Sequence, residues 1–177
     1  HQRIIHKNNV ANLIKLLLNN FKNIEIIYKP FIEKELNFHR DPISNLLKKE
    51  NLQSRIQVSH QPSIYLMKIS DIVLFDLIST GFAESINLNK LSFVFSNTFE
   101  LSLASNKGKE INRKLKEDGI VFYDEKQGYE IISNYLINKK TINNSISNSE
   151  SIILFKQYLA SPISRNDFLN KLNKLNI

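Results

Sequence analysis

A small polar segment follows an apolar run near the middle of the chain. Residues 71–76 read Asp-Ile-Val-Leu-Phe-Asp and predict a buried strand, and Ser79, Thr80 and Gly81 follow where a helical pattern begins. The first N–H groups of a helix and the helix dipole together attract phosphate. Hydroxyl side chains add hydrogen-bond donors, and glycine lets the backbone approach a ligand closely. Ser79, Thr80 and Gly81 are therefore candidates for binding the phosphate groups of a nucleotide.

Glu84 extends this predicted site by about one helical turn. Its carboxylate is suited to accept hydrogen bonds from ribose hydroxyls or from the edge of a base. A structural interpretation is also open, in which Ser79 or Thr80 caps the helix and Glu84 completes a capping box. Because helix caps are common, these residues alone favour capping, and only the wider pattern of the chain favours a ligand site.

Two further strand ends carry polar side chains. Lys29 closes a predicted strand at residues 24–29, and its ammonium group could pair with a phosphate. His60 and Gln61 follow the predicted strand at residues 55–59, where they could contact a nucleotide base. The alternatives are an exposed strand-end lysine and a structural or exposed histidine. If the strands are parallel, all these residues lie at the edge where such sheets bind ligands.

The sequence lacks the residues that several other kinds of chemistry require. The chain has no cysteine, which excludes disulfides and thiolate metal sites. The four histidines, at positions 1, 6, 39 and 60, do not have the spacing of a metal site. The sequence has no Gly-x-Ser-x-Gly motif of a serine hydrolase, and its carboxylates are too dispersed to indicate a glycosidase pair. We therefore expect no metal, and the sequence identifies no catalytic residue.

The net charge of +7 suggests either anionic partners or a composition rich in Asn, Lys and Ile, as AT-rich genomes produce. Dense Lys/Arg blocks with interleaved aromatic residues are missing from the sequence, so we expect no nucleic-acid partner. No apolar run reaches the ~18 residues of a membrane-spanning helix, and the first residues lack the apolar region of a signal peptide. We expect a cytoplasmic protein.

Strand-like and helical patterns alternate along the chain. Strands are predicted at residues 24–29, 55–59, 71–76, 91–96 and 120–124. Helices are predicted at residues 8–23, 43–51, 62–70, 81–89, 106–118, 126–138, 151–160 and 166–175. The apolar strands lack strict alternation, which indicates burial on both faces. We predict an α/β fold, in which all the strands form one open parallel Rossmann-like sheet with helices on both faces.

The composition changes after residue 140. Residues 139–151 form an Asn/Ser-rich connector, which two amphipathic helices follow. We therefore divide the chain into a Rossmann-like domain at residues 1–140 and a connector with C-terminal helices at residues 141–177. These helices either pack back on the sheet or reach a partner domain.

The sequence resembles the C-terminal, donor-binding domain of GT-B glycosyltransferases that build bacterial capsule or lipopolysaccharide, and is similar to CDP-glycerol-type and Kdo-type transferases. The resemblance covers most of residues 24–170 and rests on the segments SDIVLFDLIST…NLNKLSFVF, LKEDGIVFYDEKQGYEII and FKQYLASPISRNDFL. Two positions depart from the pattern. Phe31 stands where many relatives have the histidine of Lys-Pro-His-Pro, and Leu91 stands where they have the proline of Asn-Lys-Pro.

The resemblance implies a nucleotide-sugar donor and an enzyme of two domains. Ser79, Thr80, Gly81 and Lys29 would bind the donor phosphates, and Glu84, His60 and Gln61 would bind the ribose or the base. A polysaccharide or lipid-linked acceptor and the catalytic base would come with the N-terminal domain. Without that domain we expect little activity.

The resemblance also implies a location in the cytoplasm or at the inner face of the cell membrane, and no cofactor besides the donor. Because the chain opens with a helix where a Rossmann-like unit usually has a strand, we expect a fragment. Two alternatives stay open: a non-catalytic Rossmann-like binding or interaction module, and a domain similar to sugar-nucleotide epimerases.

Overall fold

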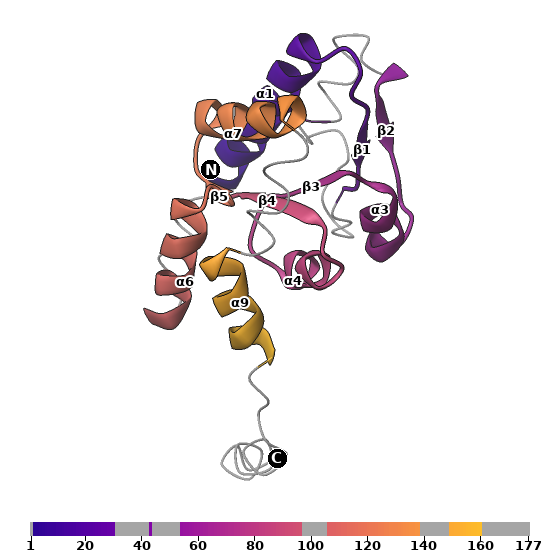
Figure 1. Ribbon diagram of the computed structural model, residues 1–177. Helices are drawn as coiled ribbons and strands as arrows, with labels where there is room; N and C mark the ends of the chain where they lie inside the picture. Colours follow the sequence, from indigo (N-terminus) through magenta and orange to yellow (C-terminus); the bar gives the residue numbers. More distant parts are fainter. Residues whose placement is uncertain (1, 31–42, 44–53, 97–105, 139–148, 161–177) are drawn as a thin grey trace.

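The computed structural model describes residues 2–30, 43, 54–96, 106–138 and 149–160 (Figure 1). Helices and strands alternate through these residues as predicted. The strands are β1 (Ile26–Tyr28), β2 (Ile56–Val58), β3 (Ile72–Phe75), β4 (Leu91–Phe95) and β5 (Val121–Phe122). The helices are α1 (Gln2–Asn20), α3 (Ser63–Ile69), α4 (Thr80–Asn87), α6 (Asn106–Glu117), α7 (Glu125–Ile137) and α9 (Glu150–Ala160). The predicted helices at residues 43–51 and 166–175 lie outside the described residues, apart from Ile43.

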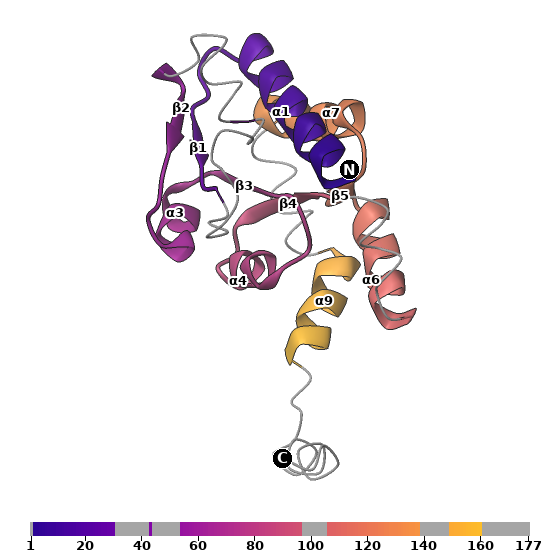
Figure 2. The same cartoon turned by 180° about the vertical axis from the view of Figure 1, so that it is seen from behind.

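The described strands form two parallel sheets. β1 pairs with β2, with Ile26 opposite Ile56, and a second sheet has the order β3-β4-β5, with Ile72 opposite Leu91. The predicted parallel direction is confirmed, but the prediction of one continuous sheet was wrong. β1 and β3 are joined by side chains, since both pack against the same apolar cluster, and not by hydrogen bonds. Figures 1 and 2 show β1 and β2 running at a steep angle to β3.

The three-stranded sheet is covered by helices on both faces, as predicted. Every residue of β4 is buried. Leu91, Phe93 and Phe95 pack on one face in a cluster with α1 and α7. Val94 packs on the other face in a cluster with α4, α6 and α9. Burial on both faces explains the absence of strict alternation in the sequence.

Two helix boundaries follow from local signals. α6 ends in a Schellman motif, in which Gly119 has a φ of 70° and the N–H of Ile120 donates to Leu115 O at 2.8 Å. α7 begins after Asp124, whose carboxylate accepts from the N–H of Gln127 at 2.8 Å. Glycine and aspartate at these positions are helix stop and start signals, and the sequence predicted both boundaries to within about one residue.

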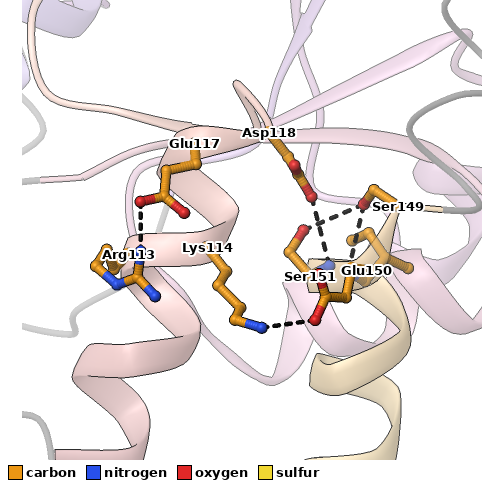
Figure 3. Close-up of polar contacts among 8 residues, drawn as sticks. Arg113, Lys114, Glu117, Asp118, Ser149, Glu150 and Ser151 are labelled. Atoms are coloured by element: carbon orange, nitrogen blue, oxygen red, sulfur yellow. Dashed lines mark hydrogen bonds and ion pairs between the residues drawn. The ribbon is translucent and has the colours of Figure 1, made fainter.

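The predicted helix at residues 151–160 is confirmed as α9, which packs back on α6 through polar contacts at its N-terminus (Figure 3). Asp118 Oδ2 accepts from the N–H of Ser151 at 3.4 Å, and Lys114 Nζ lies 2.7 Å from Glu150 Oε1. Ile152 and Phe155 are buried in the cluster shared with α4 and α6. α9 therefore completes one helical layer of the fold, and the division of the chain at residue 140 stays a prediction.

Arg55 fastens the end of α1 to the start of β2. Its guanidinium donates to the backbone carbonyls of Leu18 at 2.7 Å, Ile24 at 3.0 Å and Phe21. These carbonyls close α1 and the turn that leads into β1, where a helix has acceptors without intrahelical partners. A cation there is also favoured by the helix dipole. The Arg55 carbonyl in turn accepts from the N–H of Ile26 in β1 at 2.8 Å.

We predict that Arg55→Met destabilises the fold by about 3 kcal/mol, because several half-buried carbonyls lose a charged donor. Urea unfolding measures this loss. Arg113→Met is the matched control, since Arg113 pairs with Glu117 on the exposed face of α6 and its loss should cost at most about 0.5 kcal/mol. Equal losses in the two variants would contradict the structural role of Arg55.

Gly128 lets α7 cross directly over the fully buried ring of Phe122. A Cβ at this position would lie 2.8 Å from Phe122 Cδ2 and closer still to Cε2. Gly128→Ala should destabilise the protein by about 2 kcal/mol, because overpacking outweighs the ~1 kcal/mol gain in helix propensity. Thermal and urea unfolding test this, with Phe122→Leu as the second arm of a double-mutant cycle. If a steric conflict with the Phe122 ring is the cause, Gly128→Ala should destabilise the protein less in the Phe122→Leu background than in the wild type. Strictly additive losses of stability in the double variant would contradict this explanation.

Candidate functional site

Ser79 caps α4 at the carboxyl end of β3. Its backbone is extended, with φ −133° and ψ 176°, and its hydroxyl oxygen accepts from the N–H of Phe82 at 3.5 Å. Ser79 therefore has the capping role that the sequence left open. Glu84 does not complete a capping box, because the position three residues after the cap is Phe82.

Thr80 and Glu84 are both exposed, and they lie four residues apart on α4. Residues at this spacing share one face of a helix. The hydroxyl and the carboxylate therefore lie on the same solvent-facing side of α4, beginning at the helix N-terminus. This arrangement is the one that the predicted phosphate and ribose contacts require.

Gly81 has a packing role in the first turn of α4. A Cβ at Gly81 would lie 3.2 Å from Phe75 Cε1 and 3.7 Å from Met67 Cε. The absence of a side chain therefore lets α4 approach Phe75 of β3 closely, whereas a Cβ would make only an ordinary van der Waals contact with Met67 of α3. This role is separate from the predicted close approach to a ligand, which stays a prediction.

Lys29 and Gln61 meet at the carboxyl ends of β1 and β2. Lys29 Nζ donates to the backbone carbonyl of Gln61 at 2.8 Å, and the Gln61 N–H donates to Ser59 Oγ at 3.3 Å. His60, which lies between Ser59 and Gln61 in the chain, is exposed. The structure thus brings together the predicted residues of the two-stranded sheet, although Lys29 binds a carbonyl in this arrangement. Phe31, which follows this strand end, lies outside the described residues.

His6 is a buried residue beside the turn after β3 that the sequence interpretation missed. Its Nε2 donates to the backbone carbonyl of Asp76 at 3.0 Å, and its ring meets Phe95 edge-on with centroids 5.2 Å apart. Since a carbonyl can only accept, Nε2 carries the proton. His6 therefore holds the first residue of the turn between β3 and α4. Its spacing to the buried residues Val10 and Leu13 was the available signal, because it places His6 on the inner face of α1.

Tyr123 forms a second polar link beyond a strand end. Its hydroxyl donates to Asn112 Oδ1 at 2.6 Å, and Lys116 Nζ lies 5.3 Å from the ring centroid. Burial raises the pKa of Tyr123, and the hydrogen bond with Asn112 lowers it by a smaller amount. The pKa of Tyr135 on α7 is also raised, first by burial and then by the negative charge of Asp71.

Within the ranges that the structure describes, no three His, Asp or Glu side chains are grouped so that they could hold a metal ion. In the same ranges, no helix has the length and apolar character needed to cross a membrane.

Comparisons of the chain with protein-family models, with curated proteins and with solved structures found no match. The geometry of the described residues must therefore support any assignment of function. That geometry consists of exposed polar residues of α4, a Lys29–Gln61 contact and a buried His6, all at carboxyl ends of parallel strands.

We predict that Tyr123 contributes to alkaline unfolding. A raised pKa means that the folded state holds the phenol proton more tightly than the unfolded state. The contribution of Tyr123 to the free energy of unfolding is therefore complete below about pH 10, and it is lost as the pH rises through the folded-state pKa. Tyr123→Phe should cost about 1 kcal/mol at neutral pH, because Asn112 loses its donor. The stability difference between the wild type and Tyr123→Phe should shrink above about pH 10.

Urea unfolding between neutral and alkaline pH measures this difference. Tyr65→Phe serves as a control, because Tyr65 is 54% exposed and its variant should follow the wild type at each pH. A difference between the wild type and Tyr123→Phe that does not change with pH would contradict the prediction.

Proposed function

We propose that this chain is the nucleotide-sugar-binding domain of a GT-B-type glycosyltransferase that builds bacterial surface polysaccharide. The observation that carries the proposal is the placement of Thr80 and Glu84 on one exposed face of α4, directly beyond the carboxyl end of β3. In open parallel α/β sheets, ligands bind at this edge. Further support comes from the parallel sheet with helices on both faces, which is compatible with a Rossmann-like domain.

The donor phosphates would bind at the first turn of α4. Ser79 already satisfies the N–H of Phe82, so a phosphate would use the N–H groups of Thr80 and Gly81. The Thr80 hydroxyl adds a donor, and the helix dipole favours the negative charge. Glu84, one turn along, would accept hydrogen bonds from the ribose. His6, through the carbonyl of Asp76, would keep the approach to this turn fixed.

Lys29, His60 and Gln61 would bind the rest of the nucleotide. In this proposal the Lys29 ammonium exchanges the carbonyl of Gln61 for a phosphate oxygen, which is a stronger, charge-assisted partner. His60 and the Gln61 side chain would contact the base.

Transfer would join an acceptor hydroxyl oxygen to the anomeric carbon of the donor sugar as the bond from that carbon to the phosphate oxygen breaks. The departing phosphate gains negative charge, which the N-terminus of α4 and Lys29 would stabilise. A base on an N-terminal domain would take the proton of the acceptor hydroxyl. Alone, the chain would bind donor weakly and turn over little.

A non-catalytic binding or interaction module is the second candidate. It is favoured by the structural uses of Ser79, which caps α4, and of Gly81, which packs against Phe75. In that case the polar turn serves the fold alone.

Thr80→Val separates the two candidates. A thermal-shift screen with CMP, CDP, UDP, GDP and dTDP first identifies the nucleotide, because binding to the native state raises the Tm. Calorimetric titration should then show roughly tenfold weaker binding by Thr80→Val, since a hydrogen bond to a charged group contributes about 1.5–3 kcal/mol. The stability of this variant should change little, because Thr80 is exposed.

Ser79→Ala is the capping control and should lose about 1 kcal/mol of stability. A screen in which no nucleotide raises the Tm, or a Thr80→Val variant that binds like the wild type, would refute the donor site. Either result would favour the interaction module.

A further inference from the structure

Helix α3 exposes apolar side chains to solvent on one face. Ile64, Tyr65 and Ile69 are 49%, 54% and 55% exposed, while Leu66 and Met67 are buried. Because successive residues of a helix are about 100° apart, Ile64, Tyr65, Lys68 and Ile69 share the outer face. We call these four residues the α3 surface.

Among the side chains that the structure describes, exposed apolar residues are most closely grouped on α3. Single exposed apolar side chains are normal on protein surfaces. Elsewhere among the described side chains, Ile5 and Leu16 lie three turns apart on α1, Ile153 and Tyr158 lie five residues apart on α9, and Ile137 and Val58 are single examples on α7 and β2. α3 has three within seven residues, and clustered exposed apolar side chains of this kind are a feature of docking surfaces.

Lysines surround this apolar patch. Lys68 is part of the α3 surface, and Lys29 Nζ binds the carbonyl of Gln61 just before the helix starts. At the other end, Lys90 Nζ donates to the carbonyls of Lys68 at 2.7 Å and Ser70 at 3.0 Å. Positive charge therefore lies at both ends of α3 and on its outer face.

Acidic residues do not offset this charge on α3 itself, whose sequence is Ser-Ile-Tyr-Leu-Met-Lys-Ile. Asp71, which is exposed and lies two residues beyond the helix, supplies one negative charge against the positive charges of Lys29, Lys68 and Lys90. Figure 1 shows α3 at the outer end of the molecule, below β1 and β2 and beyond α4. The α3 surface is thus apolar, basic and peripheral.

We propose that the α3 surface docks on the face of an anionic phospholipid membrane. Ile64 and Ile69 would enter the boundary between headgroups and acyl chains, and Tyr65 would lie at headgroup level, where tyrosine is enriched. Lys29, Lys68 and Lys90 would lie near lipid phosphates, and the net charge of +7 adds a long-range attraction. Lysine is depleted from protein–protein interfaces, so lysines around an apolar patch fit a lipid surface better than a protein partner.

This inference does not require the proposed transferase function, and a lipid-binding experiment tests it directly. The full chain is sedimented with vesicles of phosphatidylcholine alone or of equal parts phosphatidylcholine and phosphatidylglycerol. We expect binding to the anionic vesicles at low salt, weaker binding as salt rises, and little binding to phosphatidylcholine alone.

Variants then locate the docking site. Ile64→Ser/Ile69→Ser should lower the partition coefficient on anionic vesicles at least about tenfold. The variant lacks the two aliphatic side chains that the wild type would transfer from water into the membrane. Lys68→Glu should lower it about fivefold or more, because a charge attracted to the lipid is reversed. The matched control, Ile5→Ser/Ile137→Ser, changes residues that are 49% and 68% exposed and should bind as the wild type does.

Three results would overturn the proposal. The first is an absence of binding to the anionic vesicles, and the second is an equal loss in the α3 and control variants when circular dichroism shows that both are folded. The third is a wild-type chain that self-associates in sedimentation equilibrium, fails to bind vesicles and becomes monomeric in Ile64→Ser/Ile69→Ser. That result would identify the α3 surface as a contact between copies of the chain.

Discussion

Burial of β4 on both faces is the constraint on which the rest of the structure depends. Phe93 and Phe95 must be covered on one side and Val94 on the other, so helices are needed on both faces of the sheet. Removal of a buried phenylalanine side chain typically costs about 3–5 kcal/mol, which makes this strand the energetic centre of the fold. The neighbouring strands are parallel, so each strand is joined to the next through a connection with a helix that returns the chain to the same end. The carboxyl ends of the strands consequently share one edge, where Ser79 and Ser96 follow their strands.

Charged side chains from other elements hold the ends of three helices. Arg55 satisfies carbonyls at the C-terminal end of α1, and Lys90 does the same for α3. Asp118 accepts from the N-terminal end of α9. In each case the sign of the charge matches the helix dipole, so hydrogen bonding and electrostatics act together. Asn89, which precedes Lys90, has a φ of 53°, a left-handed conformation that asparagine tolerates. The Asn89-Lys90 pair therefore has a structural role in this chain.

The candidate ligand site and the α3 surface lie next to each other in the fold. Gln61, which binds Lys29, is two residues before α3, and Met67 on the inner face of α3 lies close to Gly81 at the start of α4. A short helix thus separates the polar strand ends from the apolar surface. If both proposals hold, a membrane-docked chain would present its nucleotide site close to the lipid surface, where a lipid-linked acceptor is found. Lys29 would then stand at the border of the two regions, within reach of phosphates from either side.

The sequence by itself determined most of the helices and strands and their parallel α/β character, because these depend on periodicity and on local signals such as Gly119. It also gave Ser79 as one of two possible caps of α4, whereas α1 begins six residues before its predicted start. It also located the polar strand ends and predicted that Lys29 and Gln61 lie at one edge. Tertiary structure decided what depends on contacts between distant segments: the separation into two sheets, the clamp formed by Arg55, and the place of His6 beneath the turn after β3. Tertiary packing also explains Gly128, because any side chain at this position would collide with the ring of Phe122. Local sequence patterns cannot specify such contacts, because a side chain can bind a residue far away in the sequence only after packing has brought the two within a few ångströms of each other.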